Sequence, residues 1–152
     1  MTLDSTSQYA LPDVNLEEKT PEEIYEIGVN LFEEGKYNEA IAVLLQSDLT
    51  NFSVQYVLGN CYFEQRNYLE AVRCFGKIVK TIPNHHEECI MVLNLCALCF
   101  MQQENWKPAI HYLKKALTLN EKDLQTVTNY GICLCKIRKY NEFNLENDME
   151  SL

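Results

Sequence analysis

The chain has 152 residues, of which 47% are hydrophobic and 23% charged, and its formal net charge is −9. This composition is typical of one globular domain, and five glycines and four prolines are few for a loop-rich β protein. The acidic balance disfavours nucleic acid as the main ligand, no run of about 18 apolar residues predicts a membrane span, and the N-terminal residues lack the pattern of a signal peptide.

The N-terminal residues, 1–20, are predicted to form a flexible acidic leader, since their start has no helical period. Residues 1–34 hold nine acids and a single base, Lys19, which is compatible with a partner that carries basic segments near the first helix. The segment Gln8–Leu16, "QYALPDVNL", combines apolar side chains with a proline. It is either a disordered leader or a segment that occupies the binding groove of its own or a neighbouring copy.

Amphipathic segments with short breaks follow the leader and predict a helical domain over residues 21–141. Thr20 and Pro21 suit a helix cap and a first helical position, and Pro108 falls in a first turn, where its missing N–H costs little. The acidic end, 142–152, is predicted to be a partial capping helix or tail. The expected helices are 21–34, 37–47, 52–65, 68–81, 87–103, 106–119, 123–136 and a partial one over 139–149.

A small residue recurs in every second segment, and the residues after it recur in step. The small residues are Gly28, Gly59, Ala97 and Gly131. An aromatic follows nine residues after each, at Tyr37, Tyr68, Trp106 and Tyr140, and an alanine follows twelve after the first three, at Ala40, Ala71 and Ala109. Small residues let two helices approach closely, and turns at "EEGKY", "EQRNY", "QQENW" and "KIRKY" would join the pairs. Because one pair cannot bury its apolar face alone, the pairs are expected to stack into a solenoid.

These residues resemble the tetratricopeptide repeat family over roughly residues 21–141. The second repeat carries the resemblance best, with Gly59, Tyr62, Tyr68 and Ala71. The resemblance implies an all-α, right-handed superhelical solenoid of antiparallel helix pairs, with about three full repeats and a partial fourth. The spacings of 31, 38 and 34 depart from a regular repeat, and Phe143 stands where the fourth alanine should be.

In this family the first helix of each pair lines the concave face, so residues one turn apart on those helices are the expected contacts. The face is mostly apolar and bears tyrosines, which predicts a protein or peptide segment with apolar anchors, or a partner helix. Some of its large residues could instead fill interfaces between repeats. The predicted partner-binding residues are Tyr25, Val29, Phe32, Tyr56, Asn60, Phe63, Asn94, Leu98, Met101 and Thr128.

The face also argues against one subclass of the family, the members that clamp the C-terminal carboxylate of heat-shock chaperones. Those members use lysine, asparagine and arginine here, and Asn60 is the one match. A carboxylate-clamp ligand is therefore not expected.

The segment "NHHEEC", residues 84–89, brings His85, His86, Glu88 and Cys89 together and raises the possibility of a metal site. No second Cys/His pair follows at the spacing of known zinc motifs, and His111 lies on another helix. The better interpretation is an expanded turn between repeats, whose glutamates open the next helix. No metal or cofactor is predicted.

Seven cysteines, an odd number without a secretion signal, indicate reduced thiols in the cytoplasm or nucleus. Cys96 and Cys99 have the spacing of a redox pair, but they fall in mid-helix and no βαβ pattern surrounds them. With Cys89 they form one helical stripe, which is typical of small core residues.

The sequence therefore predicts a non-catalytic protein–protein interaction module, such as an adaptor, a co-chaperone-like protein or an assembly subunit. Neither nucleic acid nor a membrane is an expected partner, and self-association is left open. An alternative is a chaperone of bacterial type III secretion, since small tetratricopeptide chaperones of that system are similar in size and acidity. An alternative of another class is a thiol-redox or metal-binding protein.

Overall fold

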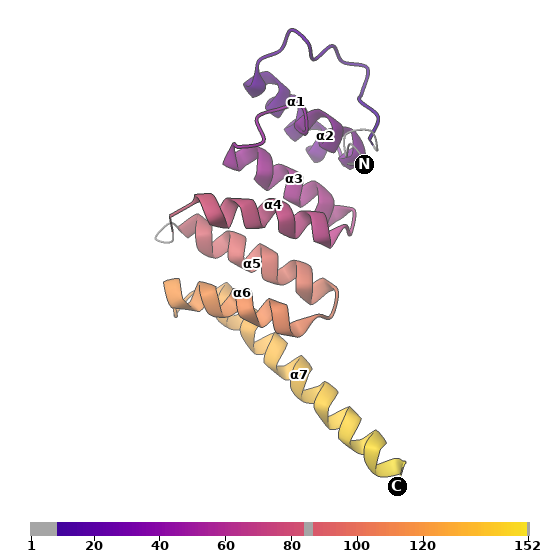
Figure 1. The fold of residues 1–152 in the computed structure, drawn as a ribbon, viewed down its shortest axis with the longest axis vertical. Helices are drawn as coiled ribbons and strands as arrows, with labels where there is room; N and C mark the ends of the chain where they lie inside the picture. Colours follow the sequence, from indigo (N-terminus) through magenta and orange to yellow (C-terminus); the bar gives the residue numbers. More distant parts are fainter. Residues whose placement is uncertain (1–8, 84–86, 152) are drawn as a thin grey trace, which may run out of the picture. The chain divides into compact units, whose positions relative to one another are not determined.

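The computed structural model describes residues 9–83 and 87–151, and all the regular structure in that part of the chain is helical (Figure 1). The expected all-α fold is confirmed, and up to α6 the helices keep within three residues of their predicted bounds. None of the described helices is long and apolar enough to cross a membrane. The helices are α1 (Pro21–Glu33), α2 (Tyr37–Leu44), α3 (Phe52–Glu64), α4 (Tyr68–Thr81), α5 (Glu87–Gln102), α6 (Trp106–Leu119) and α7 (Leu124–Glu150).

Helix α1 begins with a capping box that the sequence encodes locally. The Glu23 backbone N–H donates to Thr20 Oγ1 at 3.2 Å, and the Thr20 N–H donates to Glu23 Oε2 at 2.8 Å. Pro21 takes the first helical position, where no hydrogen-bond donor is required. The hydrogen bond from the Thr20 backbone is the largest cause that lowers the pKa of Glu23.

The first three helix pairs are joined by the same turn. Gly35, Arg66 and Glu104 stand seven residues after the small residue of their helix, and all three have positive φ, at 75°, 60° and 54°. In each turn the next residue donates its N–H back to a carbonyl five residues earlier, over 2.8–2.9 Å, in the first case from Lys36 to Leu31. This left-handed ending satisfies carbonyls that the helix leaves without a partner and reverses the chain.

The chain divides into two compact units, Met1–Ile78 and Val79–Leu152. In the first unit, Gly28 and Gly59 lie against second helices, and the core includes fully buried Leu44 and Phe75. In the second unit, α5, α6 and α7 enclose one cluster of Ala97, Ala109, Leu113 and Cys133. A second cluster there is formed by Cys89, Leu93 and Ala116.

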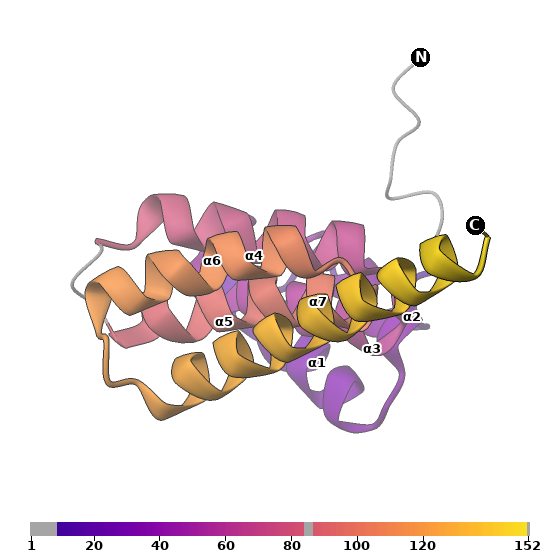
Figure 2. The same ribbon diagram turned by 90° about the horizontal axis from the view of Figure 1, so that it is seen from below.

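The predicted turn at "KIRKY" is wrong, because α7 continues through it as one helix of 27 residues (Figures 1 and 2). Arg138 stands where the other pairs have a left-handed residue, a conformation that costs about 1–2 kcal/mol in a non-glycine residue. At Arg66 the same cost is offset, because the turn there allows α4 to pack its apolar side chains. Residues 139–150 carry Phe143 and Asn147 where a second helix has a small and a large apolar residue, so folding back offers no comparable burial.

Candidate functional site

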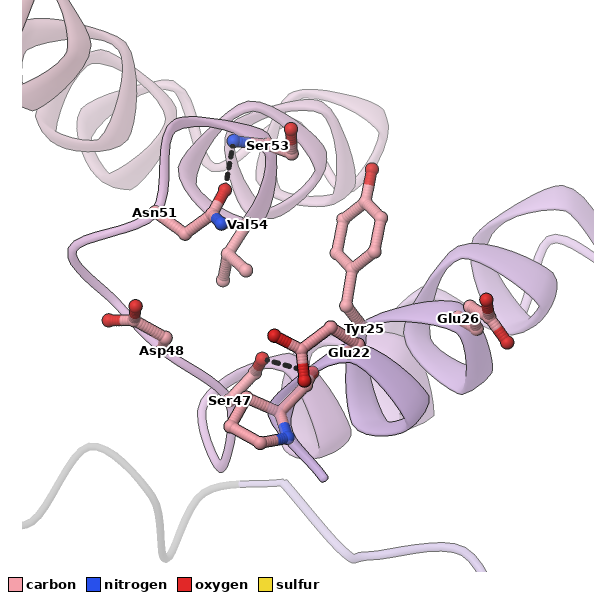
Figure 3. Close-up of a pocket in the computed structure, with 9 residues that line it drawn as sticks. Glu22, Tyr25, Glu26, Ser47, Asp48, Asn51, Ser53 and Val54 are labelled. Carbon is pink, nitrogen blue, oxygen red and sulfur yellow. Dashed lines mark hydrogen bonds between the residues drawn. The ribbon is translucent and has the colours of Figure 1, made fainter. Parts of the chain in front are cut away.

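A hollow in the first unit lies between the start of α1, the α2–α3 loop and the start of α3 (Figure 3). Its volume is about 360 Å³. Tyr25 stands on α1 beside α3, Glu22 lies at its base, and Asp48 lies across the hollow on the loop. The remaining lining residues are Pro21, Glu26, Ser47, Asn51, Ser53 and Val54.

The loop that closes this hollow is held at three points. Ser47 Oγ donates to the Pro21 carbonyl at 3.0 Å, which ties the loop to the first turn of α1. Asp48 Oδ1 accepts from the Thr50 N–H at 2.9 Å, and Asn51 Oδ1 caps α3 by accepting from the Ser53 N–H at 2.8 Å. These short-range bonds make the wall of the hollow a defined surface.

A second hollow continues the first along α1, because both are lined by Tyr25 and Glu26. It adds Val29 and Asn30 and has a volume of about 220 Å³. Two of the predicted contact residues, Tyr25 and Val29, therefore line hollows on one side of α1, where both are half-buried. Their partly exposed apolar surface can be covered by a ligand side chain.

The charge around these hollows is strongly negative. The first unit has thirteen acidic and five basic residues, whereas the second has nine and eight. Glu22, Glu26 and Asp48 line the larger hollow, and no lysine or arginine does. The amino ends of α1 and α3 oppose this with roughly half a positive charge each, so the balance stays negative. Hydrogen bonds from Thr50 keep the pKa of Asp48 low, which keeps that carboxylate ionised.

The other predicted residues of the first unit lie in aromatic contacts. Phe32 packs against Tyr37 with ring centroids 5.6 Å apart, and Phe63 packs against Tyr68 at 5.4 Å. Each is half-buried and braces the aromatic residue that opens the next helix. Phe32 and Phe63 thus have a packing role in the repeat, in addition to whatever surface they present.

Tyr56 and Asn60 lie one turn apart on α3, and both are half-buried. The Tyr56 ring lies parallel to that of Phe52, with centroids 6.2 Å apart. Asn60 Nδ2 donates to the Tyr56 carbonyl at 3.0 Å, which uses part of the amide within its own helix.

In the second unit, Asn94 does not reach the surface as the repeat register predicts; its side chain is 3% exposed. Asn94 Nδ2 donates to Thr126 Oγ1 at 2.7 Å and to the Ile90 carbonyl at 3.0 Å, and its Oδ1 accepts from Asn129 Nδ2 at 3.1 Å. Asn94 therefore joins α5 to α7, because a buried amide must find its partners inside the protein.

The remaining predicted residues of the second unit are dispersed. Leu98 and Met101 are half-buried on α5, and Met101 packs on the cluster around Ala97. Thr128 is exposed on α7, where its hydroxyl donates to the Leu124 carbonyl at 2.8 Å.

Burial makes four of the thiols, those of Cys61, Cys74, Cys96 and Cys99, unsuited to redox or nucleophilic chemistry. All seven cysteines are free, and all but Cys135 are buried. Burial raises the pKa of Cys96 and of Cys99 to about 12, as it does for Cys61 and Cys74. A thiol with such a pKa is protonated at neutral pH, so the Cys96–Cys99 pair lacks the thiolate that redox exchange requires.

Within residues 9–83 and 87–151, no group of three histidine, cysteine, aspartate or glutamate side chains could hold a metal ion. His85 and His86, which raised the possibility of a metal site, lie outside the described residues.

Tyr9 of the leader packs edge-on against Tyr62 of α3, with ring centroids 6.4 Å apart. Burial, and secondarily the carboxylate of Glu70, raises the pKa of Tyr9. Tyr62 lies about 100° or more around the helix from Tyr56 and Phe63. Tyr9 thus contacts a different side of α3 from the predicted binding face, while Gln8 lies outside the described residues.

Comparison with known families agrees with this architecture. Residues 51–122 match the family model of the tetratricopeptide repeat. Residues 9–78 match the model of anaphase-promoting complex, cyclosome, subunit 3. The chain belongs to the tetratricopeptide repeat family.

Solved tetratricopeptide structures share the fold at low sequence identity. A tetratricopeptide repeat protein from Parabacteroides merdae has a TM-score of 0.69 and 19% identity, over 80% of this chain and 47% of that one. The type III secretion chaperone SycD of Yersinia enterocolitica, solved with a peptide of the translocator YopD, has a TM-score of 0.65 and 18% identity, over 76% of this chain and 92% of that one. The first tetratricopeptide domain of Spaghetti (RPAP3), bound to the HSP90 peptide SRMEEVD, has a TM-score of 0.66 and 15% identity, over 78% of this chain and 94% of that one.

Among curated proteins, Protein unc-45 homolog B of Xenopus tropicalis is 26% identical over 84 residues, which are 55% of this chain and 9% of that protein. The homologue of Xenopus laevis is 27% identical over the same length. This chain thus spans about a tenth of the length of the curated relatives that it matches.

The residues predicted from the register include Tyr25, which lines the larger hollow, but none of the opposite wall, formed by Ser47, Asp48 and Asn51. A signal for that wall was present in the segment "SDLTN", whose side chains favour loops that bond to their own backbone. What the segment could not indicate is that Ser47 would bond to Pro21, 26 residues earlier.

Proposed function

We propose that this tetratricopeptide protein is a non-catalytic interaction module whose first unit binds an extended, basic segment of a partner protein along α1. One observation carries the proposal: the hollows at Tyr25 and Val29 join along one side of the helix and are rimmed by carboxylates. An apolar side chain of the partner covers Tyr25 and Val29, and a neighbouring lysine or arginine lies by Glu22 or Asp48.

The chemistry of the hollow supports this choice of ligand. A cation that lies near two carboxylates and a tyrosine ring gains from both the charges and the ring face. An acidic segment, including the C-terminal carboxylate of a clamp ligand, would be repelled by the same groups. The long-range field of an acidic unit also favours the approach of a basic partner.

Tyr56 and Asn60 are proposed as further contacts of the first unit, and Leu98, Met101 and Thr128 as a separate contact region on the second. The free, buried thiols support work in a reducing compartment, the cytoplasm or the nucleus. The similarity to the Yersinia chaperone is one of fold, so the secretion-chaperone alternative stays a prediction from the sequence.

The test selects ligands from a random peptide library against the full chain and then measures the enriched peptides in solution. We expect lysine or arginine beside an apolar residue in the enriched peptides. Tyr25→Ala should weaken their binding about tenfold or more, as for a central aromatic contact. The double variant Glu22→Gln, Glu26→Gln should weaken it about threefold to tenfold and reduce its salt dependence.

The matched control is Glu17→Gln, Glu18→Gln, which removes two charges from the leader at residues that line neither hollow. Its effect on binding should be smaller than that of the pair on α1. Enrichment of acidic peptides, or equal binding by wild type and Tyr25→Ala, would rule the proposal out.

A further inference from the structure

Helix α7 has the sequence of a first helix, but in the part of the chain that the structure describes no second helix of its own follows it. Gly131 occupies the position of Gly28 in α1 and Gly59 in α3. A Cβ added to Gly28 would lie 2.5 Å from Leu44 Cγ, and one added to Gly59 would lie 2.5 Å from Phe75 Cε1. A Cβ added to Gly131 would meet nothing within 4 Å among the described atoms.

The neighbours of Gly131 are exposed where their counterparts are buried. The residue four before the small residue is 6% exposed in α1, 3% in α3 and 2% in α5, but 46% in α7. These residues are Ile24, Gln55, Leu93 and Val127. Three after the small residue, Tyr62 is 6% exposed and Leu134 is 46% exposed. Leu124, one turn before Val127, is 79% exposed.

We call Leu124, Val127, Gly131 and Leu134 the open face of α7. The helix packs with its other side, through Thr126 and Cys133, which are both fully buried. The exposure of the open face therefore does not arise because α7 is detached from the domain. Helix α7 packs against α5 and α6 through those residues and Asn94.

The rest of α7 does not cover the open face. The C-terminal part of α7 runs away from α6 (Figures 1 and 2), and Tyr140 and Phe143 are 64% and 60% exposed. The same segment of a second copy of the chain also does not suit the open face. In that segment Asn147 stands at the position that contacts the small residue in the other helix pairs. A polar amide there would be buried against apolar side chains without a partner.

We propose that the open face of α7 binds an amphipathic helix of a partner protein, in the place that the second helix of a repeat would take. The three second helices of this chain define the chemistry of that helix. Each has a small residue followed four residues later by a large apolar one: Ala40 and Leu44, Ala71 and Phe75, Ala109 and Leu113. In the first two pairs the large residue lies on the glycine of the first helix, and in the third it shares a cluster with Ala97; the small residue lets the two backbones approach.

The antiparallel packing of the chain's own helix pairs sets the expected direction of the partner helix. Arg138 lies one turn beyond Leu134 on the same side of α7 and is exposed, and its Nε donates to Glu142 Oε1 at 2.9 Å. In an antiparallel pair the amino end of the second helix lies near this end of the first. Two of the chain's own second helices have a glutamate in their first turn, Glu39 and Glu70. The partner helix is thus expected to carry an acidic first turn, which also suits its own dipole.

The test uses the full chain and a fluorescent peptide of residues 67–82 with Cys74→Ser, which carries Glu70, Ala71 and Phe75 in the required order. Fluorescence anisotropy should show saturable binding. Gly131→Leu should weaken binding at least tenfold and leave the melting temperature unchanged or raised, because the new side chain has space in the free protein and leucine favours a helix. Gln125→Leu, an exposed position off the open face, should bind as wild type does.

Two further comparisons make the result specific. A peptide with Ala71→Phe and Phe75→Asn, the residues found at 143 and 147, should bind at least tenfold more weakly. Glu22→Gln, Glu26→Gln should bind this probe as wild type does, which separates the open face from the hollow at Tyr25. The proposal is overturned by absent binding, by equal binding to Gly131→Leu, or by a wild-type dimer that Gly131→Leu dissociates.

Discussion

Adding one methyl group at Gly59 or at Gly131 should have opposite effects on stability. In Gly59→Ala the Cβ would lie 2.5–2.8 Å from three ring atoms of Phe75, which is fully buried and has no room to swing aside. Overpacking of this kind costs about 1–3 kcal/mol, and the better helix propensity of alanine offsets about 0.5–1 kcal/mol of it. The net loss is expected to be about 1–2 kcal/mol. Gly131→Ala gains the propensity without the clash and should be stabilising by about 0.5–1 kcal/mol.

Thermal unfolding followed by circular dichroism measures both variants beside wild type. For a chain of this length 1 kcal/mol moves the melting temperature by about 2–4 °C. Gly59→Ala should therefore melt several degrees below wild type, and Gly131→Ala slightly above it. Gly28→Ala is the matched third variant and should lower the melting temperature as Gly59→Ala does, because Leu44 lies against Gly28 as Phe75 lies against Gly59. A Gly131→Ala protein that melts as low as Gly59→Ala would refute the argument that the open face is empty.

Three other predictions concern the ends of helices and the core. Asn94→Ala should cost about 1–3 kcal/mol and speed hydrogen exchange in α7, because it removes the buried link to Thr126; unchanged exchange there would contradict this role. Thr20→Ala should cost about 1 kcal/mol by removing the cap of α1, which denaturant titration would detect as a lower midpoint than that of wild type; an unchanged midpoint would contradict the cap. Stability should fall as the pH rises above about 9, since burial raises the pKa of Cys61, Cys74, Cys96 and Cys99 to about 12 and the unfolded thiols lose their protons first. Urea midpoints that are equal at neutral and alkaline pH would count against that burial.

Much of the fold followed from local signals. Six helices were predicted within three residues of their bounds. The signals were the cap at Thr20, the proline after it, and the small and aromatic residues that recur at a fixed spacing. These signals act between near neighbours in sequence, so they can be recognised without knowledge of the fold. The solenoid class followed too, because a helix pair with one apolar face must stack.

The candidate site was predicted less completely. Tyr25 and Val29 line a hollow, and their contact with a partner stays a prediction, whereas Asn94 is 3% exposed and serves the packing of α7. Register assigns a residue to a side of its helix, and it does not say whether a later helix will cover that side. Asp48 and Ser47 were missed because their place depends on a loop that bonds to a residue far back in the chain.

The sequence by itself determined which segments are helical and which of their sides are apolar, since helix periodicity and capping are properties of neighbouring residues. Tertiary structure alone decided which of those apolar sides found a partner. Gly28, Gly59 and Gly131 have the same local setting, yet the first two lie under Leu44 and Phe75 and the third is open. The difference arises because a turn at Arg138 would have to bury Asn147 at the contact, and such burial does not offset the cost of reversing the chain.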